Sequence, residues 1–243
     1  MAGQLRIGII GYAGRMGQAI AGEITADSGC TLAGGVILEG QTAPKVEGAI
    51  ITSNADEVIK ASDVIIDFSL AESVPGNVRR VASHKKPYMC GVTGLSKETL
   101  EDLIAAGSKI PVVYASNTSI SLAVMKQITL HAAKLLADFD YDVSILDEHH
   151  RMKQDAPSGT AKTLGEAVLR GNGGKKTPSY AAVRAGAIVG EHEVAFVGQG
   201  EIIRLRHSVT DRHIFARGAL QAAKWLQGKP AGFYGMEDVV GIG

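Results

Sequence analysis

The first half of the chain repeats short apolar runs that are separated by longer amphipathic segments. The apolar runs typical of buried strands are Leu5–Ile10, Cys30–Ile37, Val64–Phe68, Pro87–Cys90 and Pro111–Tyr114. The segments with helical spacing are Gln18–Ala26, Val74–His84 and Ser96–Ser108. Because strands that alternate with helices usually pair in parallel, this half predicts an α/β domain with a Rossmann-like parallel sheet.

The second half has a different rhythm. A long helix is predicted over Ser121–Ala137, an alternating strand from Tyr141 to Glu148, and a second helix after Ser158. Glu191–Val209 contains two alternating runs around a Gly-Gln-Gly turn, which is typical of an antiparallel hairpin. These elements predict a smaller α+β domain with a mixed or antiparallel sheet.

The last amphipathic segment, Asp211–Gln227, can return to the first domain as a helix. We therefore predict a dinucleotide-binding domain formed by residues 1–119 and 213–243. Residues 120–212 are predicted to form a substrate-binding and oligomerisation domain. Such a small domain cannot cover both faces of its sheet, and exposed apolar sheet positions often form interfaces. The hairpin positions predicted to do so are Val194, Phe196, Ile202 and Ile203.

Composition narrows the possible partners. The chain has 243 residues, of which 45% are hydrophobic, and its 25 basic residues balance 25 acidic ones. No basic block interleaved with aromatic residues occurs, so nucleic acid is not an expected partner. Neither a cleavable signal pattern nor an apolar run long enough for a bilayer is visible, so no membrane partner is expected. Two cysteines, interpreted as buried thiols, agree with a reducing cytoplasm.

A glycine turn follows the first predicted strand and precedes the first predicted helix. Its glycines, Gly11, Gly14 and Gly17, have a Gly-x-x-Gly-x-x-Gly spacing that lets backbone amides approach a pyrophosphate. A tight turn without a ligand is the alternative interpretation. Two further strand ends with small residues should face the same crevice and leave room for a nicotinamide. The predicted cofactor-binding residues are Gly11, Tyr12, Ala13, Gly14, Arg15, Met16, Gly91, Val92, Thr93, Ala115, Ser116, Asn117 and Thr118.

The most specific segment runs from Glu148 to Ala161. His149 and His150 leave the end of a strand, and Pro157 and Ser158 carry signals for the start of a helix. We expect the amides around Ser158 to Thr160 to be unpaired donors that attract a carboxylate or phosphate. Lys153 adds a positive charge, and histidine is easily held near its own pKa at neutral pH. This combination suits the protonation of a small acidic substrate.

Simpler interpretations exist for the same residues. Adjacent histidines in a loop are often only solvated or hydrogen-bonded, and Ser-Gly-Thr before a helix is often only a cap. A metal site is not predicted, because the chain has no His-x-x-x-His pair and Cys30 and Cys90 lie far apart in sequence. The occurrence of the segment together with a dinucleotide turn favours an enzyme.

These motifs closely resemble those of the 4-hydroxy-tetrahydrodipicolinate reductase family, also called dihydrodipicolinate reductase, over nearly the whole chain. The segments that carry the resemblance are Gly11–Gly17, Gly91–Gly94, Glu148–Lys153, Asp155–Ala161, and Gly190–His192 with Phe196 and Gly198. The resemblance implies reduction of 4-hydroxy-tetrahydrodipicolinate to tetrahydrodipicolinate by hydride transfer from NADH or NADPH in lysine and diaminopimelate biosynthesis. It also implies a cytoplasmic homotetramer.

The resemblance further implies roles for individual residues. His149 would be the general acid, and Lys153 a second proton donor or charge stabiliser. The residues that would hold the substrate carboxylates are His150, Lys153, Ser158, Gly159 and Thr160, with Arg212 as an additional candidate. Two alternatives remain at this stage. A non-catalytic dinucleotide-binding redox sensor would not need His149 and Lys153, and another two-domain imine, amine or sugar dehydrogenase would not predict Asp155–Ala161.

One position departs from the family pattern. The family often has an acidic residue at the end of the second strand, where a carboxylate can bind the adenosine ribose hydroxyls. This chain has Ile37 and Leu38 there, and Glu39 follows one or two positions later. The preference for NADH or NADPH is therefore open, and we expect the enzyme to use both.

Overall fold

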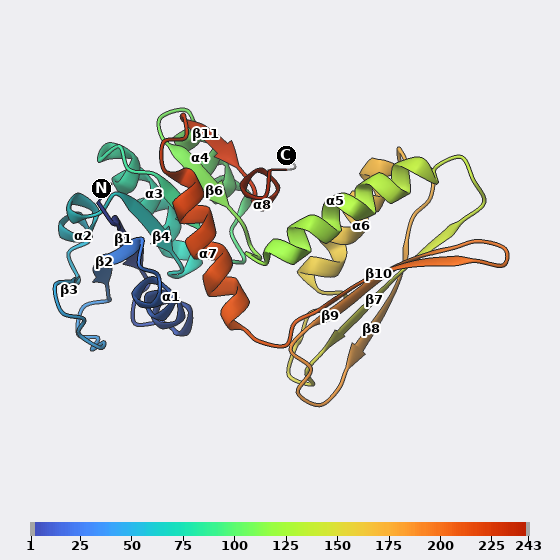
Figure 1. Cartoon of the computed structure of the whole chain (residues 1–243), viewed down its shortest axis with the longest axis horizontal. Coiled ribbons are helices and arrows are strands. Elements are labelled where there is room, and N and C mark those ends of the chain that lie inside the picture. Colours follow the sequence, from blue (N-terminus) through green and yellow to red (C-terminus); the bar gives the residue numbers. More distant parts are fainter. Residues whose placement is uncertain (1–2, 242–243) are drawn as a thin grey trace. The chain divides into compact units, whose positions relative to one another are not determined.

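The computed structural model describes residues 3–241 and divides them into two compact units (Figure 1). Unit 1 contains residues 3–118 and 213–241, and unit 2 contains residues 119–212. The predicted boundaries were 1–119 with 213–243 and 120–212, of which residues 1, 2, 242 and 243 lie outside the described part. Within residues 3–241, no helix combines the length and apolar character needed to cross a membrane.

Unit 1 is built on a seven-stranded parallel sheet with the order β11-β6-β5-β4-β1-β2-β3. Its strands are β1 (Leu5–Ile10), β2 (Cys30–Val36), β3 (Ile50–Thr52), β4 (Val64–Asp67), β5 (Tyr88–Cys90), β6 (Pro111–Tyr114) and β11 (Gly232–Tyr234). The central strands are apolar along their length because helices cover both faces (Figure 1). The predicted α/β class with a Rossmann-like sheet is confirmed.

Two helices of unit 1 begin at residues whose side chains satisfy free backbone amides. Asn54 caps α2 and Ser96 caps α4 through their side chains. The helical elements are α1 (Arg15–Ala26), α2 (Ala55–Ala61), a 3-10 turn η1 (Ala71–Ser73), α3 (Val74–Ser83), α4 (Lys97–Gly107), α7 (His213–Leu226) and α8 (Met236–Val239). The predicted return of the last long helix to the first domain is correct, because α7 packs on α1 and on the central strands. Both cysteines are buried free thiols, as predicted.

Unit 2 contains a four-stranded mixed sheet with the order β10-β9-β7-β8. Its strands are β7 (Asp142–His149), β8 (Ser179–Arg184), β9 (Glu191–Val197) and β10 (Ile202–Ser208), and its helices are α5 (Ile120–Leu135) and α6 (Gly159–Gly171). Strand β9 runs antiparallel to both neighbours, whereas β8 pairs parallel to β7. Both helices cover one face of the sheet (Figure 1).

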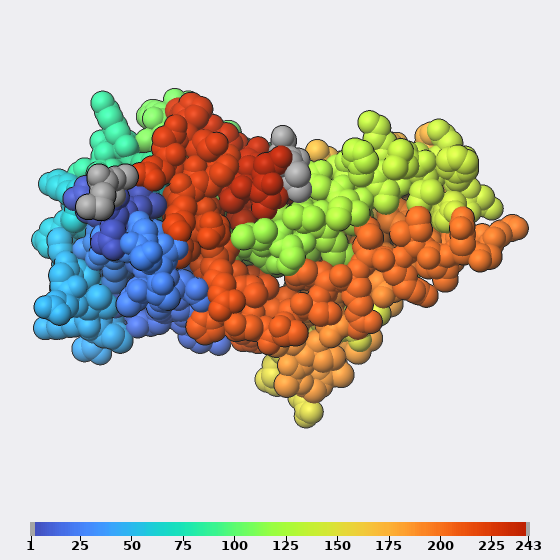
Figure 2. Space-filling view, in the orientation of Figure 1, coloured from blue at the N-terminus to red at the C-terminus, as the bar shows by residue number. Residues whose placement is uncertain are grey.

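The prediction that four apolar hairpin residues are exposed was wrong for two of them. Val194 and Phe196 are buried in a core with Val143, Ile145 and Leu164, because α5 and α6 cover that face. Ile202 and Ile203 are exposed, as expected. Helix α5 also forms part of the surface in Figure 2, and its last residue, Leu135, is 68% exposed.

Candidate active site

Strand β7 brings a polar group into the interior of unit 2. Its residues alternate between the two sheet faces, and Val143 and Ile145 point into the core beneath the helices. The same alternation turns Asp147 and His149 inward at the end of the strand. Asp147 is fully buried, and His149 is 9% exposed. A buried carboxylate is tolerated only when charged or polar partners surround it.

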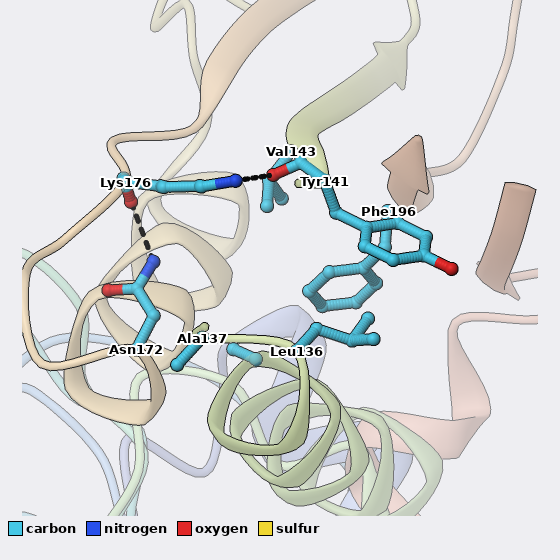
Figure 3. Close-up of a pocket in the computed structure, with 8 residues that line it drawn as sticks. Leu136, Ala137, Tyr141, Val143, Asn172, Lys176 and Phe196 are labelled. Atoms are coloured by element: carbon cyan, nitrogen blue, oxygen red, sulfur yellow. Dashed lines mark hydrogen bonds between the residues drawn. The ribbon is translucent and has the colours of Figure 1, made fainter. Parts of the chain in front are cut away.

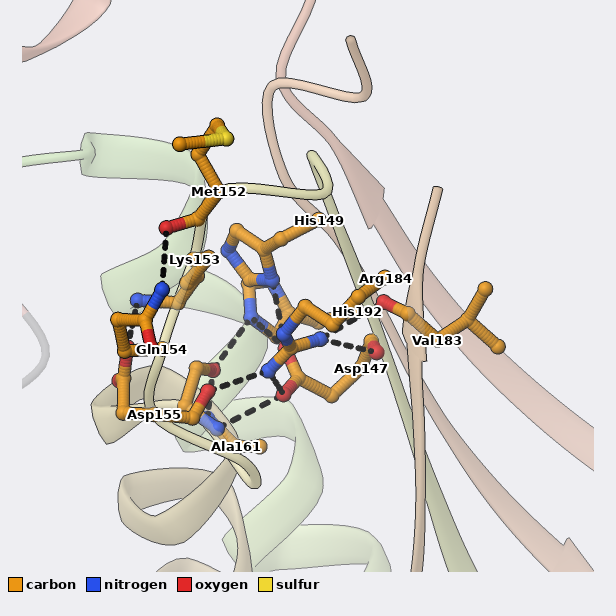
Figure 4. Close-up of polar contacts among 11 residues, drawn as sticks. Asp147, His149, Met152, Lys153, Gln154, Asp155, Ala161, Val183, Arg184 and His192 are labelled. Carbon is orange, nitrogen blue, oxygen red and sulfur yellow. Dashed lines mark hydrogen bonds and ion pairs between the residues drawn. The ribbon is translucent and has the colours of Figure 1, made fainter. Parts of the chain in front are cut away.

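Partners from three other segments surround Asp147 (Figure 4). One carboxylate oxygen, Oδ1, lies 2.8 Å from His149 Nδ1 and 3.3 Å from His192 Nε2. The other, Oδ2, accepts hydrogen bonds from the Arg184 guanidinium at 2.8 Å and from the Ser158 amide at 2.7 Å. Strand register explains the gathering, because Asp147 pairs with His192 of β9 and His149 pairs with Arg184 of β8.

The two histidine rings pack edge to face, with centroids 5.1 Å apart. The Nδ1 to Oδ1 separation of His149 and Asp147 is that of a close ion pair, although the two groups are not aligned as a directed hydrogen bond. Burial lowers the pKa of His149, and at this distance the carboxylate still acts on the ring by its charge to raise that pKa. Ser158 Oγ lies 3.1 Å from His192 Nε2 and connects this group to the start of α6.

These contacts determine which groups carry charge. Burial opposes the ionisation of Asp147, but the bonds from Arg184 and Ser158 outweigh it and hold its pKa below the usual range. Burial lowers the pKa of His192 to about 4, so this ring is neutral at pH 7. Burial also lowers the pKa of His149, and Lys153 and Arg184 add to that effect, while Asp147 raises it. Of the two rings, His149 is the better proton carrier near neutral pH.

The second ring nitrogen of His149 faces Gly190, which directly precedes β9. A Cβ atom at position 190 would lie 3.1 Å from His149 Nε2, closer than a methyl group normally approaches a ring nitrogen. Glycine at this position therefore avoids a close contact with Nε2. Nδ1 is committed to Asp147, so Nε2 is the nitrogen through which His149 can exchange a proton with a bound molecule.

The start of α6 corrects one expectation. The amides around Ser158 to Thr160 were predicted to be unpaired, but the Ser158 amide donates to Asp147, and Ser158 Oγ caps the helix by accepting from Ala161. Lys153 Nζ is 2.6 Å from Asp155 Oδ1. This bond to Lys153 lowers the pKa of Asp155, and the Gly159 amide contributes in the same direction. Carboxylates of the chain itself thus occupy part of the anion-binding helix end.

The remaining predicted substrate residues are less closely connected. His150 directly follows β7 and is half-buried, and its carbonyl accepts from the Lys153 amide in a tight turn. Thr160 is half-buried in the first turn of α6, and Gly159 is exposed. Arg212 is exposed at the end of unit 2. The contacts among the described residues do not join Arg212 to the group around His149.

The glycine turn of unit 1 has a backbone that requires glycine. Gly11 has a φ of +81°, and a Cβ there would lie 2.6 Å from the Phe68 carbonyl oxygen. A Cβ at Gly17 would lie 2.4 Å from the Gly11 carbonyl oxygen, so α1 can approach β1 closely. Helix α1 begins at Arg15, and its N-cap, Gly14, offers no capping side chain. A helix start of this kind fits a dinucleotide phosphate.

Several of the predicted cofactor residues have side chains that are buried in the core. Tyr12 is buried, with its hydroxyl on the Pro44 carbonyl and its ring against Gly35. Among the others, Ala13 and Met16 are half-buried, Val92, Ala115 and Thr118 are buried, Thr93 and Ser116 are exposed, and Asn117 is half-buried. Gly91 packs against the Phe68 ring. Backbone groups of this turn, rather than the Tyr12 side chain, are therefore suited to a cofactor.

Known proteins with similar sequences identify the family of this chain. The family model for the N-terminus of dihydrodipicolinate reductase matches residues 5–118, and the model for its C-terminus matches residues 121–240. The chain belongs to the dihydrodipicolinate reductase family. It is 40% identical to 4-hydroxy-tetrahydrodipicolinate reductase of Zymomonas mobilis, with 98% of both chains covered. It is 42% identical to that of Xanthomonas campestris, with 97% of this chain and 98% of the other covered.

A solved structure has the same fold. Dipicolinate-bound dihydrodipicolinate reductase from Paenisporosarcina sp. TG-14 superimposes with a TM-score of 0.83 and 20% identity, covering 96% of this chain and 97% of the other. The predicted family and enzyme class are confirmed: the protein is an oxidoreductase. Dihydrodipicolinate reductases use a nicotinamide dinucleotide, and the Rossmann-like unit and its glycine turn fit that cofactor.

Sequence reasoning gave no role to three residues of this candidate site, Asp147, Arg184 and His192, although His192 belongs to a segment that carries the family resemblance. The signal for Asp147 was present, because it precedes His149 by two residues in an alternating strand and must share its face. His192 shares the inward face of β9 with Val194 and Phe196. Arg184 gave no signal, because β8 is exposed along most of its length and does not alternate.

Asp147, His149 and His192 also have the composition of a metal site, with ligand atoms within 4.8 Å of one another. The guanidinium of Arg184 binds the same carboxylate, and its positive charge opposes a second cation. The 2.8 Å separation between Asp147 and His149 is a hydrogen-bonding distance. We therefore interpret the group as a proton-handling network.

A separate pocket in unit 2 offers less chemistry (Figure 3). It is lined by Ala133, Leu136, Ala137, Tyr141, Val143, Asn172, Lys176 and Phe196. Lys176 Nζ donates to the Phe139 and Tyr141 carbonyls, and Asn172 donates to the Lys176 carbonyl. These polar groups are used in hydrogen bonds that hold the segment after α6 against the segment before β7. We therefore interpret the pocket as a gap in the packing of unit 2.

Proposed function

We propose that the protein reduces 4-hydroxy-tetrahydrodipicolinate to tetrahydrodipicolinate in lysine and diaminopimelate biosynthesis. The observation that carries this proposal is the placement of His149, held by buried Asp147, beside Lys153 and the start of α6 in a chain of this family. The substrate is a cyclic dicarboxylate, and the Paenisporosarcina relative is described as dipicolinate-bound. A carboxylate clamp and a proton donor within one unit suit such a molecule.

Unit 1 would bind the dinucleotide and unit 2 the substrate. The Gly11 to Gly17 turn and the amide end of α1 would hold the pyrophosphate, with Gly91, Thr93, Ser116 and Asn117 at the ends of neighbouring strands. The bound nicotinamide supplies a hydride. The chain itself would supply the proton and the charges that hold the substrate, and the 4-hydroxyl group would leave as water.

His149 would act as general acid through Nε2, the nitrogen that faces Gly190. Lys153 would hold a substrate carboxylate and stabilise charge beside it. His150, Ser158, Gly159 and Thr160 would contribute further contacts, and Arg212 would join them from the end of unit 2. Asp155 already contacts Lys153, so a substrate carboxylate would have to compete with it.

We expect the enzyme to use both NADH and NADPH. Strand β2 ends at Val36, and Ile37 and Leu38 follow. Their side chains can neither bind ribose hydroxyls nor repel a phosphate. Arg15 and Lys45 are candidates for weak contacts with the extra phosphate of NADPH.

We also propose a cytoplasmic homotetramer that assembles through unit 2. The sheet face opposite α5 and α6 exposes Val183, Val197 and Ile202, which makes it a candidate interface. Light scattering at micromolar protein should give four times the mass of the chain. A stable monomer would contradict the proposed assembly.

A coupled assay tests the proposed reaction. The preceding aldolase would generate the unstable substrate, and oxidation of NADH or NADPH would be followed by absorbance. We expect oxidation that requires both the aldolase product and this protein. A redox sensor would show nucleotide binding without turnover, and a different dehydrogenase would turn over amines or sugars instead.

A further inference from the structure

One fully buried carboxylate connects the elements that form the substrate unit's site. Asp147 contacts His149 on its own strand, Arg184 on β8, His192 on β9 and the amide of Ser158 before α6. Arg184 extends the connection, because its guanidinium also donates to the Asp155 carbonyl at 2.6 Å. The loop between β7 and α6 is therefore fixed at both ends by the same carboxylate and guanidinium.

We infer that Asp147 is the positioning residue of this reductase, which orients His149 with Nε2 toward Gly190, keeps a proton on that ring, and fixes the helix start that receives the substrate carboxylates. This inference rests on the proposed role of His149 and deepens it. Asp147 itself is buried and acts through His149 and the amide of Ser158.

The charges around His149 give Asp147 its importance. Lys153 in the following loop and Arg184 on β8 both oppose a positive charge on the ring. His192 on β9 is neutral and faces both His149 and Asp147, while His207 on β10 acts on His192. Asp147 is the anionic neighbour among these described groups. Without its charge the ring would face cations and neutral groups, and its pKa would fall further.

Orientation depends on the same contact. A neutral imidazole carries one proton, and an acceptor at Nδ1 determines that Nδ1 holds it. With Nδ1 bound to Asp147, a second proton must reside on Nε2, where it can be donated. A ring freed from Asp147 can rotate or adopt the other tautomer, and Nε2 would then lose its direction.

The test compares Asp147→Asn with Asp147→Glu. A general acid works in its protonated form, so activity falls as pH rises through its pKa. Each unit by which that pKa drops lowers the protonated fraction at higher pH about tenfold. We expect Asp147→Asn to lower kcat about tenfold or more at pH 7.5 and to move the high-pH decline toward lower pH. Asp147→Glu should restore part of the lost kcat and part of the shift in the pH profile. Asp142→Asn, an exposed carboxylate on the same strand, is the matched control and should leave both unchanged.

A second readout does not depend on turnover. The ring carbons of His149, assigned with His149→Gln, can be titrated by NMR in wild type and Asp147→Asn without substrate. We expect the midpoint to fall in the variant. If Asp147→Asn does not fold, the double variant Asp147→Asn with Arg184→Gln, which also removes the buried cation, is titrated and compared with Arg184→Gln alone, because Arg184 itself lowers the pKa of His149. An unchanged midpoint together with an unchanged pH profile would overturn the inference.

The two readouts separate this inference from the proposed reaction. If wild type does not turn over the aldolase product, the proposed function fails while the NMR titration still decides the role of Asp147. Gly190→Ala gives an independent arm, because its methyl group would obstruct Nε2. We expect kcat to fall at least about tenfold, as for impaired general acid catalysis, while the NMR midpoint moves by less than in Asp147→Asn. Full activity in Gly190→Ala would contradict proton transfer through Nε2.

Discussion

Each unit of the molecule buries one aspartate at the end of a strand, and the two are held in opposite ways. Asp67 at the end of β4 is bound by neutral donors: the Tyr88 hydroxyl at 2.5 Å, the Ser69 amide at 2.8 Å and the Asn77 side chain at 2.9 Å. Asp147 at the end of β7 has the Arg184 guanidinium. Burial raises the pKa of Asp67, whereas the partners of Asp147 hold its pKa low.

The difference shows that burial does not decide the charge of a carboxylate, since its partners do. Neutral donors around Asp67 fix the loop that follows β4 next to the glycine turn, which is a structural task. A cation and two imidazoles surround Asp147, which is why we propose that this group takes part in proton transfer. Unit 1 therefore offers backbone groups to a ligand, and unit 2 offers charges.

The largest expected effect is the loss of kcat when His149, which lies beside the ionised Asp147, is replaced. General acid catalysis contributes roughly 100-fold to 10,000-fold to a rate, so His149→Gln should lower kcat by about that range. Nucleotide affinity, measured by fluorescence titration, should stay nearly unchanged. His150→Gln is the control and should act mainly through KM. Equal kcat values for wild type and His149→Gln would remove the basis for assigning chemistry to this site.

Replacing each aspartate with asparagine tests whether the ion pair of Asp147 contributes more stability than the neutral partners of Asp67. Breaking a buried ion pair costs about 3–5 kcal/mol of unfolding free energy. Three backbone carbonyls still accept from Arg184 in Asp147→Asn, so we expect about 3 kcal/mol. Asp67→Asn breaks no ion pair and keeps an acceptor for Ser69, but its amide nitrogen can no longer accept from Tyr88 and Asn77. It should cost about 1–2 kcal/mol, less than Asp147→Asn. Urea unfolding at pH 7 measures both.

The pH dependence should also differ in sign. Folding lowers the pKa of Asp147, so its stabilising contribution is present above its unfolded pKa and is lost as pH falls through the folded value. Folding raises the pKa of Asp67, so its contribution is fully present below the unfolded pKa and is lost as pH rises. The destabilisation of Asp147→Asn relative to wild type should therefore shrink in acid. A constant difference from pH 7 to pH 3 would contradict the ionised state of Asp147.

The sequence predicted the elements around the two aspartates only where their apolar residues follow a clear period. The longer strands and helices with a clear apolar period were predicted to within about three residues, whereas β8, which is exposed along most of its length, was not predicted. Short elements such as β3 and β11 have too few residues to show a period. The inward position of Asp147 was readable from β7, but its partner Arg184 was not. That contact depends on the parallel pairing of β7 with β8, which local pattern does not encode.

Substituting Lys153 tests the positive charge that unit 2 offers to a ligand. Lys153→Ala removes a charge-assisted hydrogen bond, which is worth about 1.5–3 kcal/mol. Affinity for pyridine-2,6-dicarboxylate should therefore fall roughly ten- to hundredfold by calorimetry. Asp155→Asn should have the opposite sign, because it removes the carboxylate that now contacts Lys153. A gain of a few-fold is expected, since Asp155 is about half exposed to water and the pair is partly screened. Tight binding by Lys153→Ala would place the carboxylate clamp elsewhere.

The smallest effect is expected where unit 1 meets the adenosine end of its cofactor. If this unit binds through backbone and neutral groups, changing a nearby charge should matter little. Glu39 is exposed after β2, beyond Ile37 and Leu38, and an exposed charge contact is worth only about 0.2–1 kcal/mol. The ratio of kcat/KM for NADPH and NADH should therefore lie within a few-fold of one, and Glu39→Gln should shift it by no more than that. A preference for NADH above about 30-fold, near 2 kcal/mol, that disappears in Glu39→Gln would show that a carboxylate binds the ribose. In that case unit 1, like unit 2, would recognise its ligand through charge.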